Sequence, residues 1–160
     1  MSLRTMILGL MLATAAISII SLSAQASDPV AGTWELNLAK SKFSPGPPPQ
    51  SQTRTYEVTG QQEKMTAKGI DAQGKPTLIQ FMAQRDGKDY PYEGSPGIDT
   101  IALTPVDTFT LTYTAKKAGA VVLTGTRVIS KDGKEMTISG KGTTATGQPL
   151  EVILVFDKRS

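Results

Sequence analysis

Hydrophobic and polar residues alternate with a period of two along most of the chain after position 27. The clearest example is Thr108–Ala115, where Phe109, Leu111 and Tyr113 share one face and threonines occupy the other. This alternation is typical of an antiparallel strand with one buried face. The segment Ala120–Ser130 repeats the pattern. Similar runs predict strands at Thr33–Asn37, Gln52–Val58, Lys64–Gly69, Thr77–Gln84, Asp99–Thr104, Glu135–Gly140 and Leu150–Phe156.

Glycine turn signals separate these strands. They are Thr59-Gly60, Gln73-Gly74, Asp86-Gly87, Ala118-Gly119, Asp132-Gly133 and Thr146-Gly147. Short strands joined by such turns, without a long helical pattern, predict an all-β fold: a single antiparallel up-and-down meander of about eight to ten strands. We expect a barrel or a half-open sheet. The run Leu150–Phe156 is apolar on both faces and suits a strand that closes the sheet.

Two segments depart from the alternation. Phe43–Gln50 holds four prolines and is expected to be neither strand nor helix, either a rigid connector or a polyproline ligand for another domain. Tyr90–Gly97 is rich in turn residues. It predicts a loop, either a plain corner or a loop that touches a ligand at the mouth of a barrel.

Residues 1–26 have the pattern of a secretory signal peptide. Arg4 lies in a short charged head, Met6–Leu22 is apolar, and Ala24-Gln25-Ala26 resembles a cleavage site. We therefore predict an exported protein, periplasmic or extracellular, whose mature form is one β-barrel domain over residues 27–160. The apolar run is short and no second run follows it, so we expect no stable membrane span and a soluble mature chain.

The chain contains no histidine and no cysteine. This excludes Ser-His and Cys-His nucleophile pairs, thiolate chemistry, and nitrogen or sulfur ligands for zinc, copper or haem. The acids Asp86, Asp89, Glu93 and Asp99 are close in sequence but lack the spacing of a calcium loop. We expect no metal, no cofactor and no catalysis. An enzyme that uses only carboxylates, tyrosine and lysine remains as an alternative.

Charge adds little to this picture. The 17 lysines and arginines face 14 acidic residues, and the basic residues are scattered singly. No basic run interleaves with aromatic residues, which disfavours nucleic-acid binding. We expect a monomer.

Near the start of the mature chain, a Gly32-x-Trp34 motif lies at the beginning of the first predicted strand. With the chain length and strand rhythm, this motif resembles the lipocalin and fatty-acid-binding-protein (calycin) superfamily. The stretches SKFSPGPPPQ, DGKDYP-x-x-GSP and TGTRV-x-SKDGK are also similar to small exported bacterial proteins with lipocalin-like features. The resemblance implies a barrel with a cavity for a small apolar molecule. It also implies structural roles for Gly32 and for Trp34, which would lie at the closed end under Arg159 or Arg127.

The chain departs from fatty-acid-binding proteins at two points. Those proteins carry two helices between the first two strands, whereas Leu38–Ser51 is broken here by prolines. They also end with an Arg-x-Tyr pair that holds the ligand carboxylate, whereas this chain ends Phe156-Asp157-Lys158-Arg159. The helical lid and the carboxylate clamp are therefore not expected.

Two arginines share a face with apolar residues. Arg127 has the parity of Leu123 and Ile129, and Arg54 that of Tyr56. An unpaired buried guanidinium is very costly, so each needs a partner. One interpretation is that Arg127, with Arg54, binds an acidic head group in a pocket. The other is that each reaches solvent or pairs with a loop acid such as Asp99 or Asp107. The pocket would be lined by Tyr56, Phe81, Leu111, Tyr113 and Leu123.

These features predict an exported lipocalin-like protein that binds a small hydrophobic or acidic amphipathic ligand. The alternative is a secreted protein-interaction module, such as a small β-barrel hydrolase inhibitor that acts through exposed loops. A hollow interior favours the first and a filled interior the second.

Overall fold

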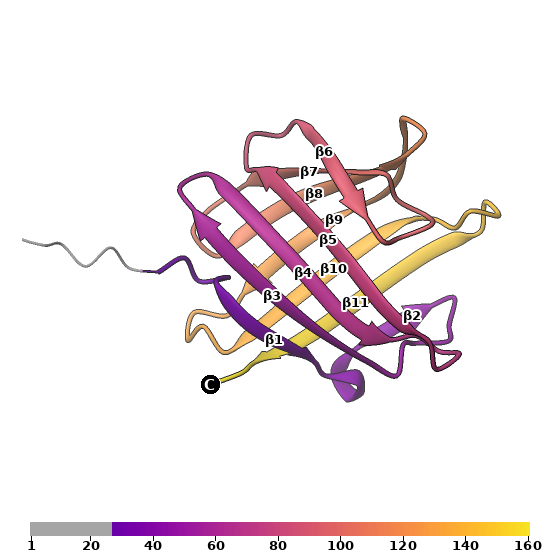
Figure 1. Cartoon of the computed structure of the whole chain (residues 1–160), viewed down its shortest axis with the longest axis horizontal. Coiled ribbons are helices and arrows are strands. Elements are labelled where there is room, and N and C mark those ends of the chain that lie inside the picture. Colours follow the sequence, from indigo (N-terminus) through magenta and orange to yellow (C-terminus); the bar gives the residue numbers. More distant parts are fainter. Residues whose placement is uncertain (1–26) are drawn as a thin grey trace, which may run out of the picture.

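The structure is a computed structural model that describes residues 27–160, and the predicted signal peptide lies outside the described residues. It contains eleven strands and one short 3-10 helix, η1, Leu38–Lys40 (Figure 1). The strands are β1 Gly32–Leu36, β2 Lys42–Ser44, β3 Ser51–Thr59, β4 Gln62–Ile70, β5 Pro76–Gln84, β6 Asp89–Glu93, β7 Thr100–Pro105, β8 Thr110–Lys117, β9 Ala120–Ile129, β10 Glu135–Thr143 and β11 Pro149–Lys158.

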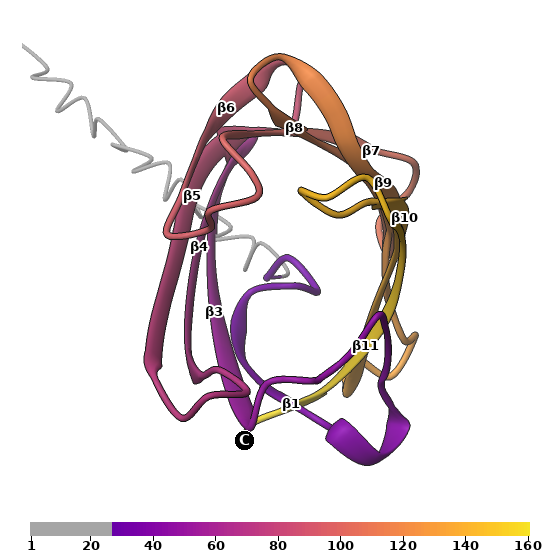
Figure 2. The same ribbon diagram turned by 90° about the vertical axis from the view of Figure 1, so that its right-hand side faces the viewer.

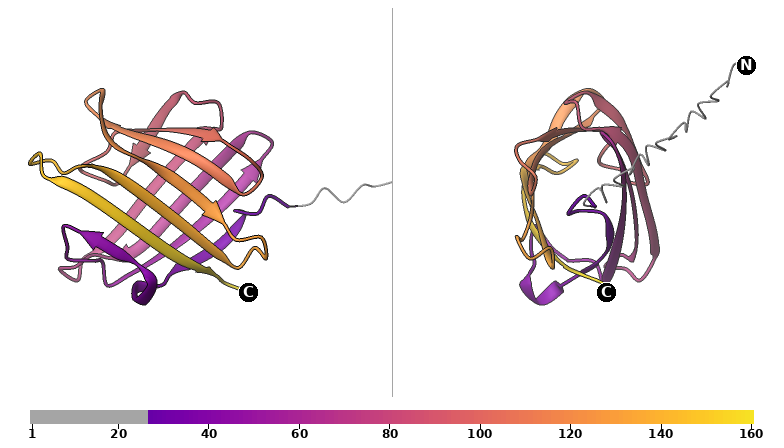
Figure 3. Two further views of the ribbon diagram at one scale, coloured as in Figure 1. Left: turned by 180° about the vertical axis from the view of Figure 1, so that it is seen from behind. Right: turned by 90° about the vertical axis from the view of Figure 1, so that its left-hand side faces the viewer.

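The strands form one antiparallel sheet that closes on itself. From β3 onward each strand pairs with the next, β1 pairs with β3, and β1 also pairs with β11. Figure 2 looks into the ring, with β3 to β5 on one side and β9 to β11 on the other, and Figure 3 shows the same arrangement from behind and from the opposite end. The predicted all-β up-and-down meander is confirmed, and it is a closed barrel. The last strand closes it, with Trp34 opposite Lys158 and Leu36 opposite Phe156.

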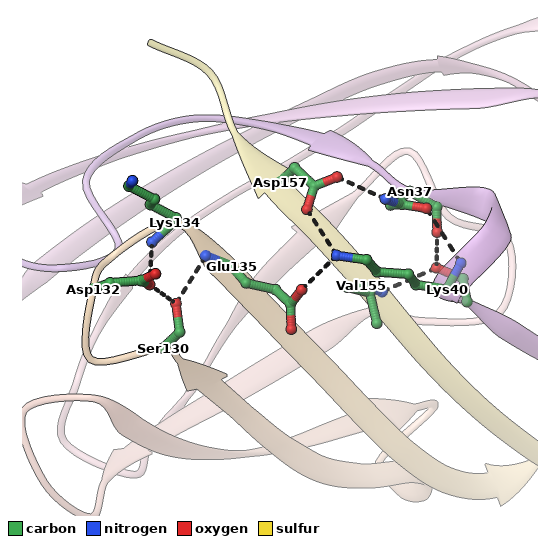
Figure 4. A network of polar contacts seen from close by, with 9 residues as sticks. Asn37, Lys40, Ser130, Asp132, Lys134, Glu135, Val155 and Asp157 are labelled. Carbon is green, nitrogen blue, oxygen red and sulfur yellow. Dashed lines mark hydrogen bonds and ion pairs between the residues drawn. The ribbon is translucent and has the colours of Figure 1, made fainter.

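The first barrel strand is interrupted. β10 pairs with β11 along one edge, so β1 and β2 both take the other edge, with η1 between them. Polar contacts hold this interruption against the barrel (Figure 4). Asn37 Nδ2 donates to Asp157 at 2.7 Å, and Lys40 Nζ donates to Glu135 at 2.8 Å. Exposed contacts of this kind contribute little stability individually, but together they fix the position of η1.

Two strands lie where the sequence predicts loops. β2 places Phe43 opposite Val152, so the expectation that no strand occurs in Phe43–Gln50 is wrong at its first residues. β6 overlaps the first residues of the predicted loop Tyr90–Gly97. Pro91 hides its alternation, and β6 pairs with β5 at only two positions. A short strand with an internal proline gives almost no local signal.

One end of the barrel is plugged by the chain itself. The segment that precedes β1 turns inward within the ring of strands (Figures 2 and 3). Val30 is buried, and its carbonyl accepts a 2.7 Å hydrogen bond from the indole nitrogen of Trp34, which is fully buried. Asp28 contacts Arg85, directly after β5. We call this the plugged end. In a meander alternate turns lie at opposite ends, so the β4–β5, β6–β7, β8–β9 and β10–β11 connections lie at the end opposite the plugged end.

The basic partner of Trp34 differs from the expectation. Lys158 Nζ lies 5.0 Å from the centre of the Trp34 ring, because the two residues are directly opposite in the β1–β11 register. Arg159, one position further, points to the other face and pairs with Glu35 at 2.7 Å. Arg127 is held elsewhere in the barrel. The expected pairing of Trp34 with Arg159 or Arg127 is therefore wrong.

Among residues 27–160, no helix has the length and apolar character needed to cross a membrane.

Candidate ligand-binding cavity

A cavity of about 90 Å³ lies inside the barrel. Its walls are mostly apolar and come from strands on both sides of the ring. All seven residues predicted for a pocket line it: Arg54, Tyr56, Phe81, Leu111, Tyr113, Leu123 and Arg127. Nine further lining residues were not predicted: Met65, Tyr92, Ile98, Ile101, Leu103, Ala115, Ile138, Val152 and Leu154.

Strand register brings these residues together in two rows. In an antiparallel sheet, residues that face each other across neighbouring strands share one face. Tyr56, Met65, Phe81 and Tyr92 are successive partners across β3, β4, β5 and β6. The second row, across β8 to β11, consists of Leu111, Arg127, Ile138 and Leu154. Alternation within each strand therefore produces a lined interior.

The position of Tyr113 depends on two glycines. Its hydroxyl donates to the Ser139 carbonyl at 3.0 Å. Gly125 and Gly140, which are partners in β9 and β10, lie beneath it. A Cβ atom at Gly125 would lie 2.7 Å from the Tyr113 hydroxyl, and one at Gly140 would lie closer still. Both positions must lack a side chain for the ring to occupy its place in the cavity.

Arg127 is paired inside the barrel. It donates to both carboxylate oxygens of Glu63, with Nη2 2.8 Å from Oε2, and its guanidinium lies 5.0 Å from the centre of the Tyr56 ring. Glu63 also accepts from Arg85 Nε at 2.9 Å, and Arg85 in turn pairs with Asp28. These four residues form a chain of alternating charge that is neutral as a whole.

The loop acids considered as partners for the arginines have other roles. Asp99 binds Lys117 at 2.6 Å, and Asp107 accepts from the backbone amide of Phe109 at 2.8 Å. The acid that binds Arg127 is Glu63, which the sequence analysis did not single out. Its parity with Met65 and Ala67, both inward residues of β4, was the available signal.

The ion-pair chain shifts its acids toward the charged form. Burial by itself would raise the pKa of Glu63, but the hydrogen bonds and positive charges of Arg127 and Arg85 outweigh it and hold that pKa below its usual range. Burial likewise opposes ionisation of Asp28, yet its hydrogen bonds to Arg85 and to the Val30 amide lower its pKa. Both acids are therefore ionised at neutral pH.

Arg54 is in a different situation. Its Nε donates to Gln52 Oε1 at 2.8 Å, its Nη1 lies 3.4 Å from the Tyr56 hydroxyl, and its guanidinium lies 4.9 Å from the centre of the Phe156 ring. Within residues 27–160, no carboxylate forms an ion pair with Arg54. A guanidinium stays charged and has five N–H donors. The two contacts of Arg54 leave most of these donors without an acceptor among the described residues. Arg54 is thus an unneutralised cation in the cavity wall.

Two partly buried phenols of the cavity wall, Tyr92 and Tyr113, remain neutral. Burial raises the pKa of Tyr113 to about 12, and it also raises the pKa of Tyr92. Their hydroxyls can therefore donate hydrogen bonds at neutral pH. In the described part of the chain, no group of three or more acidic residues is arranged to hold a metal ion. Three of the four acids considered for calcium contact lysines instead: Asp86, Asp89 and Asp99.

Comparison with known proteins supports the fold. No family description matches the chain, and no curated protein matches it in sequence. Among solved structures, the zebrafish ileal bile acid-binding protein complexed with cholic acid aligns with a TM-score of 0.51 at 14% identity, covering 82% of this chain and 99% of that one. A redesigned β-barrel, mFAP1, bound to DFHBI, aligns with a TM-score of 0.43 at 14% identity, covering 81% and 95%.

At this identity the likeness to the bile acid-binding protein concerns the fold alone. The chain shares with that protein the fold of a closed antiparallel barrel, here with an up-and-down strand order.

Proposed function

We propose that this protein is an exported, monomeric carrier that binds a small amphipathic molecule with an acidic group inside its barrel and performs no catalysis. The observation that carries the proposal is the position of Arg54 and its lack of an acidic partner. Arg54 is a cation in the wall of an apolar cavity, and it has no acidic partner among the described residues.

The cavity combines the two features that such a ligand needs. Its apolar rows provide a surface that a hydrophobic body can cover. Arg54 provides a positive charge and free N–H donors. These donors can form two parallel hydrogen bonds to a carboxylate or similar anion. Because the charge of Arg54 has no acidic partner among the described residues, the site favours an acidic ligand over a neutral one of the same shape.

Arg127 has a supporting role in this proposal. Its charge is offset by Glu63, so it has little reason to select an anion. It lies toward the plugged end, where it lines the cavity and holds the Tyr56 ring in place. Arg54 therefore replaces Arg127 as the residue we expect to recognise the acidic group.

Export is proposed from the signal-peptide pattern of residues 1–26. Asp28 and Val30, just beyond the predicted cleavage point, are anchored in the barrel. N-terminal sequencing of protein from the extracytoplasmic fraction should give Ser27 as the first residue. Stable protein that begins at Met1 or Ser2 would contradict export.

Ligand binding is tested with a neutral, environment-sensitive apolar dye and competing acids, each compared with its uncharged amide. Folded protein should bind about one dye, and the acids should displace it more strongly than the amides. Arg54→Gln should weaken the acids by about tenfold to a hundredfold, the range of a charged hydrogen bond, and leave the amides nearly unchanged. Arg159→Gln removes an exposed arginine on the outer face and should change neither.

Two outcomes would contradict the proposal. Equal losses for acids and amides in Arg54→Gln would show that Arg54 supports the fold only. If folded protein binds no dye and no acid, the interaction-module alternative through the exposed loops takes the place of the carrier.

A further inference from the structure

The volume of the cavity limits what it can hold. About 90 Å³ is well below the roughly 300–1,000 Å³ of most ligand pockets, and below the roughly 150 Å³ of an apolar protein cavity that accepts benzene. Several walls of the cavity are core side chains: Met65, Phe81 and Leu103 line it and are themselves buried. A long acyl chain would have to displace this core.

A compact ligand needs a much smaller adjustment. Leu123 and Tyr92 line the cavity but are only partly buried. Leu123 lies near the β8–β9 turn, at the end of the barrel opposite the plugged end. A shift of these side chains can enlarge the cavity by the volume of a small group without disturbing the buried centre. The cavity can therefore be enlarged enough to hold a ligand with one ring, but not a larger ligand.

The cavity walls are rich in rings. Tyr56, Phe81, Tyr92 and Tyr113 all line it, and Phe81 stacks on Tyr92 with ring centres 6.0 Å apart and an interplanar angle of 25°. Aromatic walls favour a flat aromatic guest through offset and edge-to-face contacts. Arg54 already lies over the Phe156 ring, so its planar fork is held in one orientation for a planar acid.

The charges permit only one anionic group. Arg54 is the only described cation of the cavity wall without an acidic partner, because Arg127 is offset by Glu63. Tyr92 and Tyr113 are uncharged and do not repel an anion. A second carboxylate would be buried without a counter-ion, which is strongly unfavourable.

Building on the proposed function, we infer that the ligand is a compact aromatic monocarboxylate with a single ring. Its carboxylate binds Arg54, and its ring lies among the tyrosines.

Calorimetry with four probes tests this inference: benzoate, benzamide, 2-naphthoate and hexadecanoate. The wild-type protein should bind benzoate at least about tenfold more tightly than the other three, because benzamide lacks the charge and the other two exceed the volume. Arg54→Gln should remove the advantage of benzoate over benzamide.

An enlarged cavity supplies a gain-of-function test. Leu123→Ala should improve 2-naphthoate binding by about tenfold relative to benzoate, since it removes a partly buried lining side chain. Val128→Ala, a matched change at an exposed position of the same strand, should leave the ratio of affinities unchanged.

Two results would overturn the inference and are distinguishable. If hexadecanoate binds more tightly than benzoate, the single-ring limit is wrong while the carrier function stands. If neither the apolar dye nor any acid binds folded protein, the carrier function itself is wrong and the inference falls with it.

Discussion

Glu63 of β4 and Arg127 of β9 form an ion pair across the interior of the barrel, with Arg127 Nη2 2.8 Å from Glu63 Oε2. β4 and β9 are not neighbours in the sheet, so the pair joins opposite walls. The Glu63 side chain is completely buried, and Arg127 is 6% exposed. The ion pair replaces the hydrogen bonds to water that both charged groups lose on folding.

Removing the Glu63 charge should destabilise the protein strongly. Glu63→Gln leaves Arg127 buried without a counter-ion, and breaking a buried pair in this way costs about 3–5 kcal/mol. Urea unfolding monitored by circular dichroism measures the change. Glu57→Gln, at an exposed acid of the neighbouring strand, should change the free energy of unfolding by less than about 0.5 kcal/mol. Similar losses in both variants would contradict the cross-barrel role.

Stability should fall on acidification because of the same chain of charges. The folded pKa values of Glu63 and Asp28 lie below their ordinary values. Groups shifted in this direction stabilise the fold at pH values above their unfolded pKa, near 4, and the stabilisation is lost as pH falls further. Urea midpoints measured from neutral pH down to about pH 3 should show the loss. The midpoint should depend less on pH in Glu63→Gln, and an identical slope in both proteins would contradict the assignment.

Trp34 should be the largest single contributor to the core at the plugged end. It is fully buried, and its indole nitrogen binds the Val30 carbonyl. Trp34→Ala should cost roughly 3–5 kcal/mol, and Trp34→Phe less, since a ring remains. An unchanged denaturation midpoint in Trp34→Ala would contradict this role of Trp34 in the core.

The contact between Gly140 and Tyr113 can be tested by a double-mutant cycle. Gly140→Ala places a methyl group against the Tyr113 hydroxyl and should cost about 1–3 kcal/mol. In the Tyr113→Phe background the hydroxyl is gone, so the same change should cost less. Gly97→Ala is the control, because a Cβ atom there meets nothing within 4 Å. Additive effects in the cycle would contradict the direct contact.

Local sequence signals were sufficient for most of the barrel. The alternation around Leu111 and Tyr113 belongs to β8, and the six glycines of the predicted turns all have positive φ: Gly60, Gly74, Gly87, Gly119, Gly133 and Gly147. Both signals depend on neighbouring residues only. The same alternation placed the seven predicted pocket residues on the inner face, where one cavity collects them.

Long-range contacts could not be predicted in this way. Glu63 lies near the Thr59-Gly60 turn, where an acid is usually solvated, and its partner Arg127 is 64 residues away. Only the closed ring brings them together. The different roles of Arg54 and Arg127 follow from this single contact, because parity alone makes the two arginines equivalent.

The closing strand has a consequence for the timing of folding. β11 follows all the other described strands in the chain, yet it pairs with β1, β2 and β10. Contacts between the two ends of a chain form slowly, because a large loop must close first. Until Pro149–Lys158 is available, β1 and β10 remain open edges that can recruit other strands. The ring therefore cannot close before β11 has been made, and a chain that can still be threaded until that point suits the export that we propose.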